Sequence, residues 1–262
     1  MKRSAAVILC IFISTVSIAQ KKFRTLEGAL LNPTEATELI LSGSQDYKNL
    51  SPDIAKLTNL KILKLYGCGI TKLTSAIGEL KNLEVLDLGG NYLKILPPEI
   101  CKLTKLRELS LQRNGLAELP DEIGNMVSLG QLDLSNNKLT SLPLSLYMLH
   151  YLFYLDLQFN ELAYLSPQIS MLTNLEVLDL SRNKLDNIPD KLWFTPKLYS
   201  LNLYKCGAML SFPKDICNIP SSSIKPRGAN IDSWHMQSGM VLPKCPFGND
   251  GVRNGWYINV TD

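Results

Sequence analysis

The stretch Leu83 to Ile100, LEVLDLGGNYLKILPPEI, decides the fold, because its pattern returns every 23 residues. Each copy begins with a leucine, has leucines at its fourth and sixth positions, and usually has Asn at the ninth. Leucine or isoleucine usually follows at the eleventh and fourteenth positions, and Pro at the fifteenth. A fixed period of this length is typical of a stacked solenoid rather than a closed globule. The clear copies begin at Leu60, Leu83, Leu106, Leu129, Leu152, Leu175 and Leu198.

The first half of each copy alternates apolar and variable residues, which predicts a short β-strand with one buried face. Leu86 and Leu88 are therefore expected to point inward. Val85, Asp87 and Gly89 are expected to point outward. The ninth-position Asn carries both a donor and an acceptor, so a column of Asn residues would bridge adjacent coils. Pro and acidic residues in the second half favour the start of a short helix or helical turn.

The chain ends differ from the repeats in composition. Residues 1–19 have a basic start, an apolar run and a small-residue site at Ser17-Ile18-Ala19, which predicts a cleaved signal peptide. An uncleaved anchor is the alternative, and a lipoprotein reading of Cys10 is weakened by the bulky Leu9 before it. Residues 20–36 are expected to cap the stack, with a short helix ending at Pro33. Repeats are expected over 37–220, the first of them degenerate, and a cap or loose tail over 221–262.

Charge and cysteine usage narrow the possible partners. The net charge of +3 falls to +1 when Lys2 and Arg3 leave with the signal peptide, so no basic surface for nucleic acid is expected. No membrane span is expected after cleavage. Export favours disulfides, and we expect a bond between Cys217 and Cys245, with Cys101 as the odd thiol. Cys68 and Cys206 replace Asn at the two ends of the Asn column and are expected to be structural.

The motif LxxLxLxxNxLxxLPxxIxxLxx resembles the leucine-rich repeat, in its 23-residue form with LP on the outer arm. Repeats of the Ras-suppressor type and of exported bacterial proteins are similar. The resemblance implies an α/β leucine-rich-repeat solenoid, curved, with a parallel β-sheet on the concave face and short helices or helical turns on the convex face. It also implies that the concave sheet binds other proteins. Ser166 in place of Pro and Thr195 in place of an apolar residue depart from the motif.

Catalytic chemistry has no support in the sequence. His150 and His235 are the only histidines, and neither has a metal-ligand spacing with Cys, Asp or Glu. No phosphate-binding glycine loop, dinucleotide fingerprint or nucleophile elbow is present in the sequence. We therefore expect no enzyme activity, no cofactor and no metal site.

The outward strand positions are the better candidates for function. The central column contains Asp87, Asp133, Asp156 and Asp179, which either recognise a basic partner or a cation, or are solvated filler; we favour the last interpretation. Exposed Tyr, Phe and Arg dominate binding hot spots. Phe159 alone has the alternative of tucking under its neighbours. The predicted partner-binding patch is Tyr154, Asp156, Gln158, Phe159, Asp179, Arg182 and Tyr204.

These observations predict an exported module that binds a protein partner through the concave face of the solenoid and is a monomer or weak oligomer. It would reside outside the cell, in a periplasm or at a cell surface. One alternative is a cell-surface structural protein that assembles through its tail and the odd cysteine. Another is an intracellular scaffold of the Ras-suppressor type, which requires that residues 1–19 are not a signal peptide.

Overall fold

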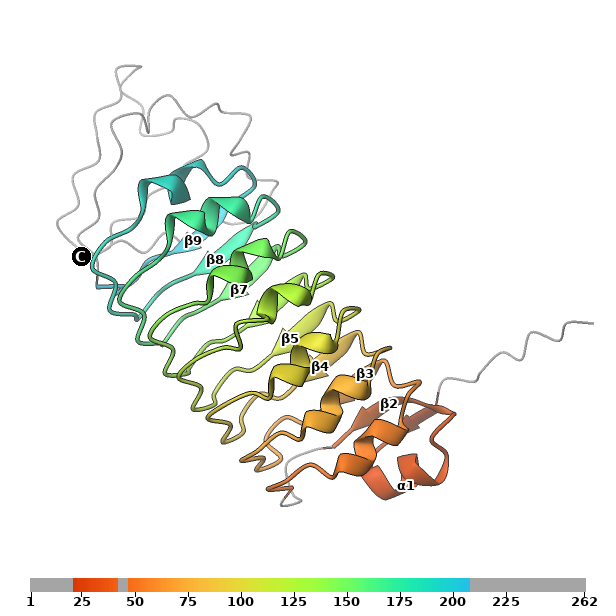
Figure 1. The fold of residues 1–262 in the computed structure, drawn as a ribbon. Helices are drawn as coiled ribbons and strands as arrows, with labels where there is room; N and C mark the ends of the chain where they lie inside the picture. Colours follow the sequence, from red (N-terminus) through yellow and green to blue (C-terminus); the bar gives the residue numbers. More distant parts are fainter. Residues whose placement is uncertain (1–20, 42–46, 208–262) are drawn as a thin grey trace, which may run out of the picture.

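The computed structural model describes residues 21–41 and 47–207. Within them, nine strands form one sheet in chain order, and every neighbouring pair is parallel (Figure 1). From β3 onward, each strand pairs with the next in a register of 23 residues, as in Leu63 with Leu86. The strands are β1 (Lys21–Phe23), β2 (Ala36–Ile40), β3 (Ile62–Lys64), β4 (Val85–Asp87), β5 (Glu108–Ser110), β6 (Gln131–Asp133), β7 (Tyr154–Asp156), β8 (Val177–Asp179) and β9 (Ser200–Asn202).

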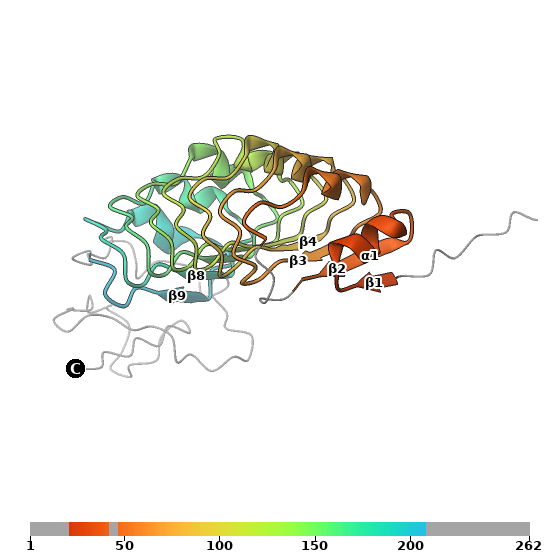
Figure 2. The same cartoon turned by 90° about the horizontal axis from the view of Figure 1, so that it is seen from below.

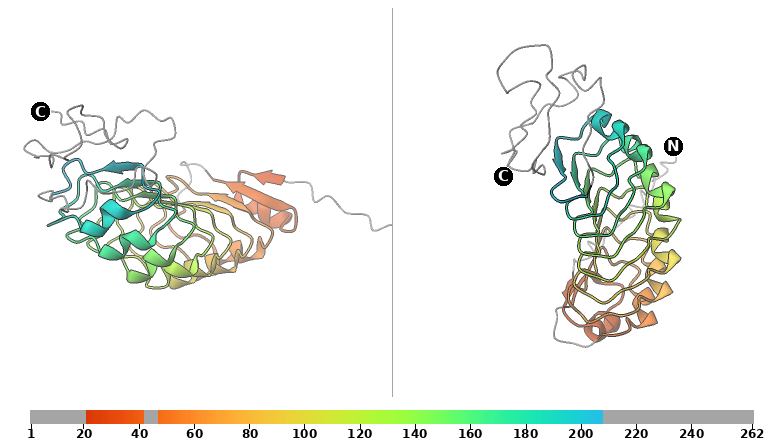
Figure 3. Two further views of the ribbon diagram at one scale, coloured as in Figure 1. Left: turned by 90° about the horizontal axis from the view of Figure 1, so that it is seen from above. Right: turned by 90° about the vertical axis from the view of Figure 1, so that its left-hand side faces the viewer.

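A row of short 3-10 helices faces the sheet across the core. Figure 2 shows these helices along the outer curve and the strands along the inner curve, and Figure 3 shows the same arrangement from two further sides. The predicted curved solenoid with a parallel sheet on its concave face is therefore confirmed. The helices are η1 (Pro52–Lys56), η2 (Ser75–Glu79), η3 (Pro98–Lys102), η4 (Ile123–Asn125), η5 (Leu144–Met148), η6 (Pro167–Met171) and η7 (Asp190–Phe194).

The core lies between the two layers and consists mostly of the repeated leucines. Leu86 and Leu88 are buried as the strand alternation predicts, while Val85 and Asp87 are half-buried on the concave face. Gly89 is also buried, because the ring of Tyr66 lies over it. Each coil thus covers the next, and the stack is stabilised by burial of apolar area between neighbours.

A ladder of asparagines, all buried except the half-buried Asn114, connects the coils. The Asn160 Nδ2 donates to Leu134 O of the preceding coil at 3.0 Å and to Leu157 O of its own coil at 3.0 Å. Its Oδ1 accepts from Leu139 N at 3.0 Å. Asn91, Asn114, Asn137 and Asn183 make the same set of bonds. The predicted ladder is confirmed, and it supplies partners for backbone groups that no sheet or helix satisfies.

Cysteines replace asparagine at both ends of the ladder, and both are buried as predicted. The Cys68 thiol donates to Leu41 O at 3.4 Å, in the role of the amide nitrogen. Cysteine has no counterpart of the Asn side-chain oxygen, and its own backbone carbonyl accepts the bond instead. Cys68 O accepts from Tyr47 N at 3.1 Å, and Cys206 O accepts from Leu185 N at 2.8 Å. A cysteine at this position therefore keeps a connection to the preceding coil.

The segment before the first repeat contributes more than the expected helix. The helix α1 (Leu26–Leu31) ends before Pro33 as predicted, and the Thr25 side chain caps it by accepting from Gly28 N at 3.1 Å. The strand β1 was not predicted, and it extends the sheet by pairing with β2. Its residues Lys21 and Lys22 form ion pairs with Glu35 and Glu38, so the edge of the sheet carries exposed charges.

The outer arms show two departures from the motif. Ser166 replaces Pro without loss, because its side chain caps η6 by accepting from Gln168 N at 3.3 Å. Thr195 is buried, and its Oγ1 has no hydrogen-bond partner among the described residues, so this departure from the motif leaves an unsatisfied hydroxyl after η7.

Cys101 is not the accessible thiol that assembly would need. It is only 3% exposed, and burial raises the pKa of its thiol to about 12. The described residues contain three free cysteines and no disulfide. The predicted signal peptide, the tail over 221–262 and the Cys217–Cys245 bond lie outside the described residues. No helix in the described ranges has the length and apolar character to cross a membrane.

Candidate functional site

The concave face is built from three columns of outward strand positions, spaced by the fixed 23-residue register. The first column contains Tyr154, the second contains Asp156 and the third contains Gln158. Every coil repeats the same backbone, so the location of each side chain follows from its position within the 23-residue repeat, which we call its frame position. The concave face therefore has the same backbone in every coil, and only the side chains differ from one coil to the next.

Asp156 is the most buried carboxylate of the central column, at 6% exposed, so the interpretation of the column as solvated filler is wrong there. Its Oδ1 accepts from Gln158 N at 3.0 Å, and its Oδ2 accepts from Gln158 Nε2 at 3.0 Å. Desolvation, with added repulsion from Asp179 and Asp133, raises the pKa of Asp156 to about 6. The other three members of the column, Asp87, Asp133 and Asp179, are half-buried.

Tyr154 covers Asp156 from the neighbouring column. Its hydroxyl lies 3.4 Å from Asp156 Oδ2, and burial first, then the nearby Asp156 charge, raises the pKa of the phenol to about 12. Tyr154, Asp156 and Gln158 therefore form one hydrogen-bonded cluster on β7 and the turn that follows it. The tyrosine remains a neutral donor at physiological pH.

The residue before each ladder position adopts a left-handed backbone conformation in every coil. In the first two clear coils this residue is Gly67 or Gly90, at φ 65° and 64°. Later coils place side-chain residues there, including Phe159 at φ 52°. A left-handed residue with a Cβ costs about 1 kcal/mol, and a bulky one is unusual. The later side-chain residues are Arg113, Asn136, Phe159, Arg182 and Lys205.

Three of these left-handed residues gather with Tyr204 at the carboxyl edge of the last strands. The Arg182 Cζ lies 4.7 Å from the ring centroid of Phe159 and 5.4 Å from that of Tyr204. The Lys205 Nζ lies 5.2 Å from the Tyr204 centroid. Phe159 is 44% exposed, so it does not tuck under its neighbours. We call Phe159, Arg182, Tyr204 and Lys205 the aromatic–cation edge.

The predicted patch therefore consists of two clusters that meet at the Gln158–Phe159 peptide bond. Asp179 lies beside the Tyr154–Asp156 cluster, with its Oδ1 accepting from Ser181 N at 2.8 Å and its Oδ2 from Asn202 Nδ2 at 2.9 Å. The prediction missed Asn202 and the role of Lys205. It also missed the column of left-handed residues, although glycine at the same frame position in two coils, Gly67 and Gly90, indicates a positive φ there.

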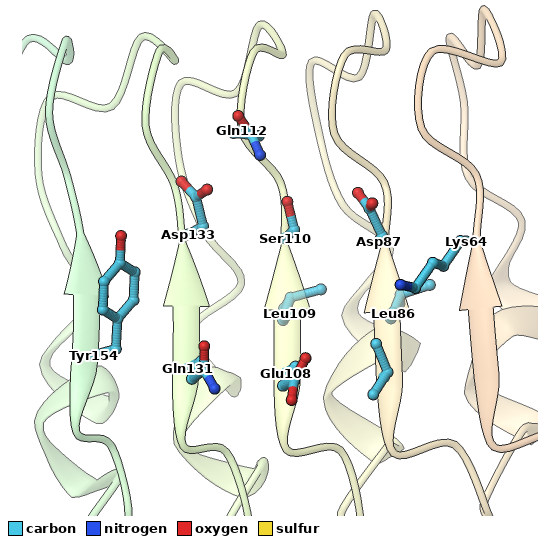
Figure 4. Close-up of a pocket in the computed structure, with 11 residues that line it drawn as sticks. Lys64, Leu86, Asp87, Glu108, Leu109, Ser110, Gln112, Gln131, Asp133 and Tyr154 are labelled. Atoms are coloured by element: carbon cyan, nitrogen blue, oxygen red, sulfur yellow. The ribbon is translucent and has the colours of Figure 1, made fainter. Parts of the chain in front are cut away.

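The opposite half of the concave face has a polar depression of about 320 Å³. Figure 4 shows Asp87, Ser110 and Asp133 in one row, and Glu108, Gln131 and Tyr154 in the row below. Lys64 extends from β3 toward β4 in the same view. Tyr154 lines this depression and also belongs to the Asp156 cluster, so it joins the two halves of the face.

The described residues contain no group of three His, Cys, Asp or Glu side chains that is placed to hold a metal ion. His150 lies on an outer arm, exposed, and its carbonyl accepts from Asn174 Nδ2 at 2.6 Å. It follows η5 and precedes β7, so it is not one of the outward strand positions that form the concave clusters. His235 lies outside the described residues.

Comparisons with known proteins agree with this architecture. A family model described as a leucine-rich repeat region matches residues 38–138, and a second, Leucine Rich Repeat, matches 128–149 and 174–194. No curated protein sequence matches the chain. A leucine-rich repeat protein of Leptospira interrogans is 36% identical, with a TM-score of 0.65 over 76% of this chain.

Two more distant solved structures share the fold alone. An internalin of Listeria monocytogenes is 23% identical with a TM-score of 0.62 over 75% of this chain. A plant peptide hormone receptor, RGFR1 in complex with RGF2, is 24% identical with a TM-score of 0.60 over 77% of this chain. The chain covers 56%, 58% and 37% of the lengths of the Leptospira, Listeria and plant proteins, respectively.

Parallel strands in strict register, an outer row of 3-10 helices and a buried asparagine ladder together define a solenoid repeat protein. The chain belongs to the leucine-rich repeat family. The narrower assignment to the 23-residue LP type stays a prediction.

Proposed function

We propose that the protein is an exported, non-enzymatic binding module that recognises a protein partner through the predicted patch on its concave face. The observation that carries this proposal is the exposed Phe159, held in a left-handed conformation beside Arg182. Sites that retain backbone strain and exposed aromatic area are typical of recognition surfaces.

The scaffold supports binding by being formed in advance. Tyr154 and Asp156 lie on the sheet, and Phe159 is fixed by the Phe159 N to Ser181 O bond at 2.9 Å. Side chains held in this way lose little conformational freedom when a partner arrives. Tyr154, Phe159 and Tyr204 supply apolar area and Arg182 supplies orientation, while the buried Asp156 holds Gln158 in place.

The structural relatives are consistent with this role. The plant receptor of similar fold is a peptide hormone receptor solved in complex with RGF2. Its identity to this chain is low, so the likeness supports the use of the fold for protein ligands and not a particular ligand. The cell-surface assembly alternative loses its bridging thiol, because Cys101 is buried.

The test is the affinity of a crosslink-captured native partner for a double variant, Tyr154→Ala with Phe159→Ala. Two hot-spot truncations of this kind are expected to weaken binding by about 2–4 kcal/mol, or ~30-fold or more. Tyr92→Ala and Tyr164→Ala are matched controls, since both tyrosines are exposed and lie off the sheet.

Unchanged affinity of the double variant would contradict the placement of the site. A loss of affinity in the two control variants would instead move the site to the convex side or the loops. Export is tested separately by sequencing the amino terminus of the mature protein. A terminus at Gln20 agrees with signal cleavage, and a retained Met1 contradicts it and favours the intracellular alternative.

A further inference from the structure

The Arg182 side chain is held in place yet has no acidic partner in the described part of the chain. One ring beside it comes from Phe159 in the preceding coil and the other from Tyr204 in the following coil, at 4.7 and 5.4 Å from Cζ. The ion pairs among the described residues involve other side chains, and Arg182 takes part in none of them.

The two rings and the donors of the guanidinium use different directions. Cation–π contacts use the flat faces of the guanidinium, whereas its five N–H groups point outward in its plane. No hydrogen bond from the Arg182 side chain is found among the described residues, although its backbone N–H donates to Tyr204 O at 2.8 Å. The N–H groups of Arg182 therefore have no acceptor among the described residues, and a guanidinium fork can bind a carboxylate through two parallel bonds.

The acidic column next to the aromatic–cation edge limits which anions fit. Asp156 and Asp179 precede Phe159 and Arg182 by three positions, which corresponds to about 10 Å along an extended chain. An anion with several charges would meet these carboxylates, whereas a single carboxylate on Arg182 would not. Lys205, which contacts the Tyr204 ring, adds positive charge to the aromatic–cation edge.

We propose that Arg182, clamped by Phe159 and Tyr204, is the receptor for one carboxylate group of the protein partner, either an Asp or Glu side chain or a chain terminus. This inference rests on the proposed function, because it names the chemistry of one contact within the same patch. The partner's carboxylate would supply the acidic group that the described residues do not give to Arg182.

A displayed library of random 12-residue peptides with free carboxyl termini tests the inference without the native partner. Peptides selected on the whole protein would be resynthesised in three forms: unchanged, with Asp and Glu changed to Asn and Gln, and with an amidated terminus. We expect removal of one carboxylate source to lower affinity by at least ~10-fold. The form that loses affinity identifies the side chain or the terminus as the source.

Arg182→Gln is expected to lower the affinity of the unchanged peptides by a similar factor and to make them insensitive to carboxylate removal. Arg182→Lys keeps the charge and is expected to lose most of the affinity, because an ammonium has no planar fork. Arg113→Gln is the matched control, since Arg113 has the same frame position and a φ of 52° but stacks on no ring in the described ranges.

The outcomes separate the inference from the proposed function. Peptides that lose affinity with Tyr154→Ala and Phe159→Ala, yet bind equally with or without carboxylates, overturn the inference alone. Equal loss in the Arg113→Gln and Arg182→Gln variants also overturns it, because general charge would then explain the effect. Failure to select any peptide whose binding depends on Tyr154 or Phe159 overturns both.

Discussion

Tyrosines stand at the same frame position in the first and last clear coils, and they have opposite surroundings. Near the amino-terminal end, the ring of Tyr66 lies over Gly89 and Gly90, so close that an added Cβ would come within about 3 Å of it. Near the carboxyl-terminal end, the ring of Tyr204 contacts Arg182 and Lys205. Because Gly89 and Gly90 have no side chain, the Tyr66 ring can lie directly on the backbone. The Tyr204 ring instead contacts the Arg182 side chain, which the Phe159 ring also contacts.

The contrast shows that the left-handed position decides the chemistry of each end of the concave face. Where the position is Gly67 or Gly90, the backbone is relaxed and nothing projects toward a partner. Where it is Phe159 or Arg182, the same turn carries strain and presents a large side chain. Because the coils are otherwise superimposable in register, this difference belongs to the surface and not to the scaffold.

The largest expected effect tests whether the scaffold is equal at the two ends. Asn91→Ala and Asn160→Ala each remove the side-chain hydrogen bonds to two carbonyls and one backbone N–H. Each substitution is expected to lower the free energy of unfolding by about 3 kcal/mol, from roughly 1 kcal/mol for each lost hydrogen bond. Urea denaturation followed by circular dichroism measures the loss.

Asn187→Ala is the control, because Asn187 is exposed, and it is expected to change stability by less than about 0.5 kcal/mol. A difference of more than about 1 kcal/mol between the two ladder variants would show that the ends differ in scaffold as well as in surface.

The next effect concerns the buried carboxylate near the aromatic–cation edge. The folded-state pKa of Asp156 is about 6, above the ordinary value of 3.8. The folded protein therefore binds the proton more tightly than the unfolded chain, and this group makes folding less favourable as pH rises from about 4 to 6. Asp156→Asn is expected to raise stability by on the order of 2 kcal/mol at pH 7.5 and to change it little at pH 4.

An amide fits at this frame position, since Asn202 occupies it in the last coil and donates to Asp179. Asp87→Asn, at the opposite end, is the control and is expected to have a smaller effect because Asp87 is half-buried. Urea unfolding of both variants at the two pH values gives the comparison. A stabilisation by Asp156→Asn that is the same at pH 4 and pH 7.5 would contradict the assignment of the cost to the buried charge.

The sequence alone predicted the scaffold well because every part of it is periodic. Leu86 and Leu88 are buried by strand alternation, and the column that includes Asn137 forms the ladder for which it has the donors and acceptors. The strand β1 escaped prediction because three residues, KKF, carry no alternation that a frame could detect.

The site was predicted only in part, because its geometry depends on contacts between coils. The repeat pattern predicted that Tyr154, Phe159 and Arg182 share one face. It did not predict the cation–π contacts between successive coils. The burial of Asp156 arises from Tyr154 and Gln158 packing around it, and the same residue type at Asp87 is half-buried. The backbone conformation was not predicted either, because arginine at position 113 is not a residue type that indicates a positive φ.

The smallest expected effect tests the strain itself, with substitutions of opposite sign at one frame position. Gly67→Ala adds a Cβ at φ 65° with no atom within 4 Å, so its cost of about 1 kcal/mol would be purely that of the backbone. Arg113→Gly removes a Cβ at φ 52° and is expected to raise stability by about 0.5 kcal/mol, the relief being partly offset by the greater freedom of glycine in the unfolded chain. Paired urea titrations resolve the two signs. If both variants were destabilised, side-chain contacts at the left-handed position would stabilise the fold by more than the backbone strain costs. The conformation of Phe159 would then be explained by stability alone, without a role in binding.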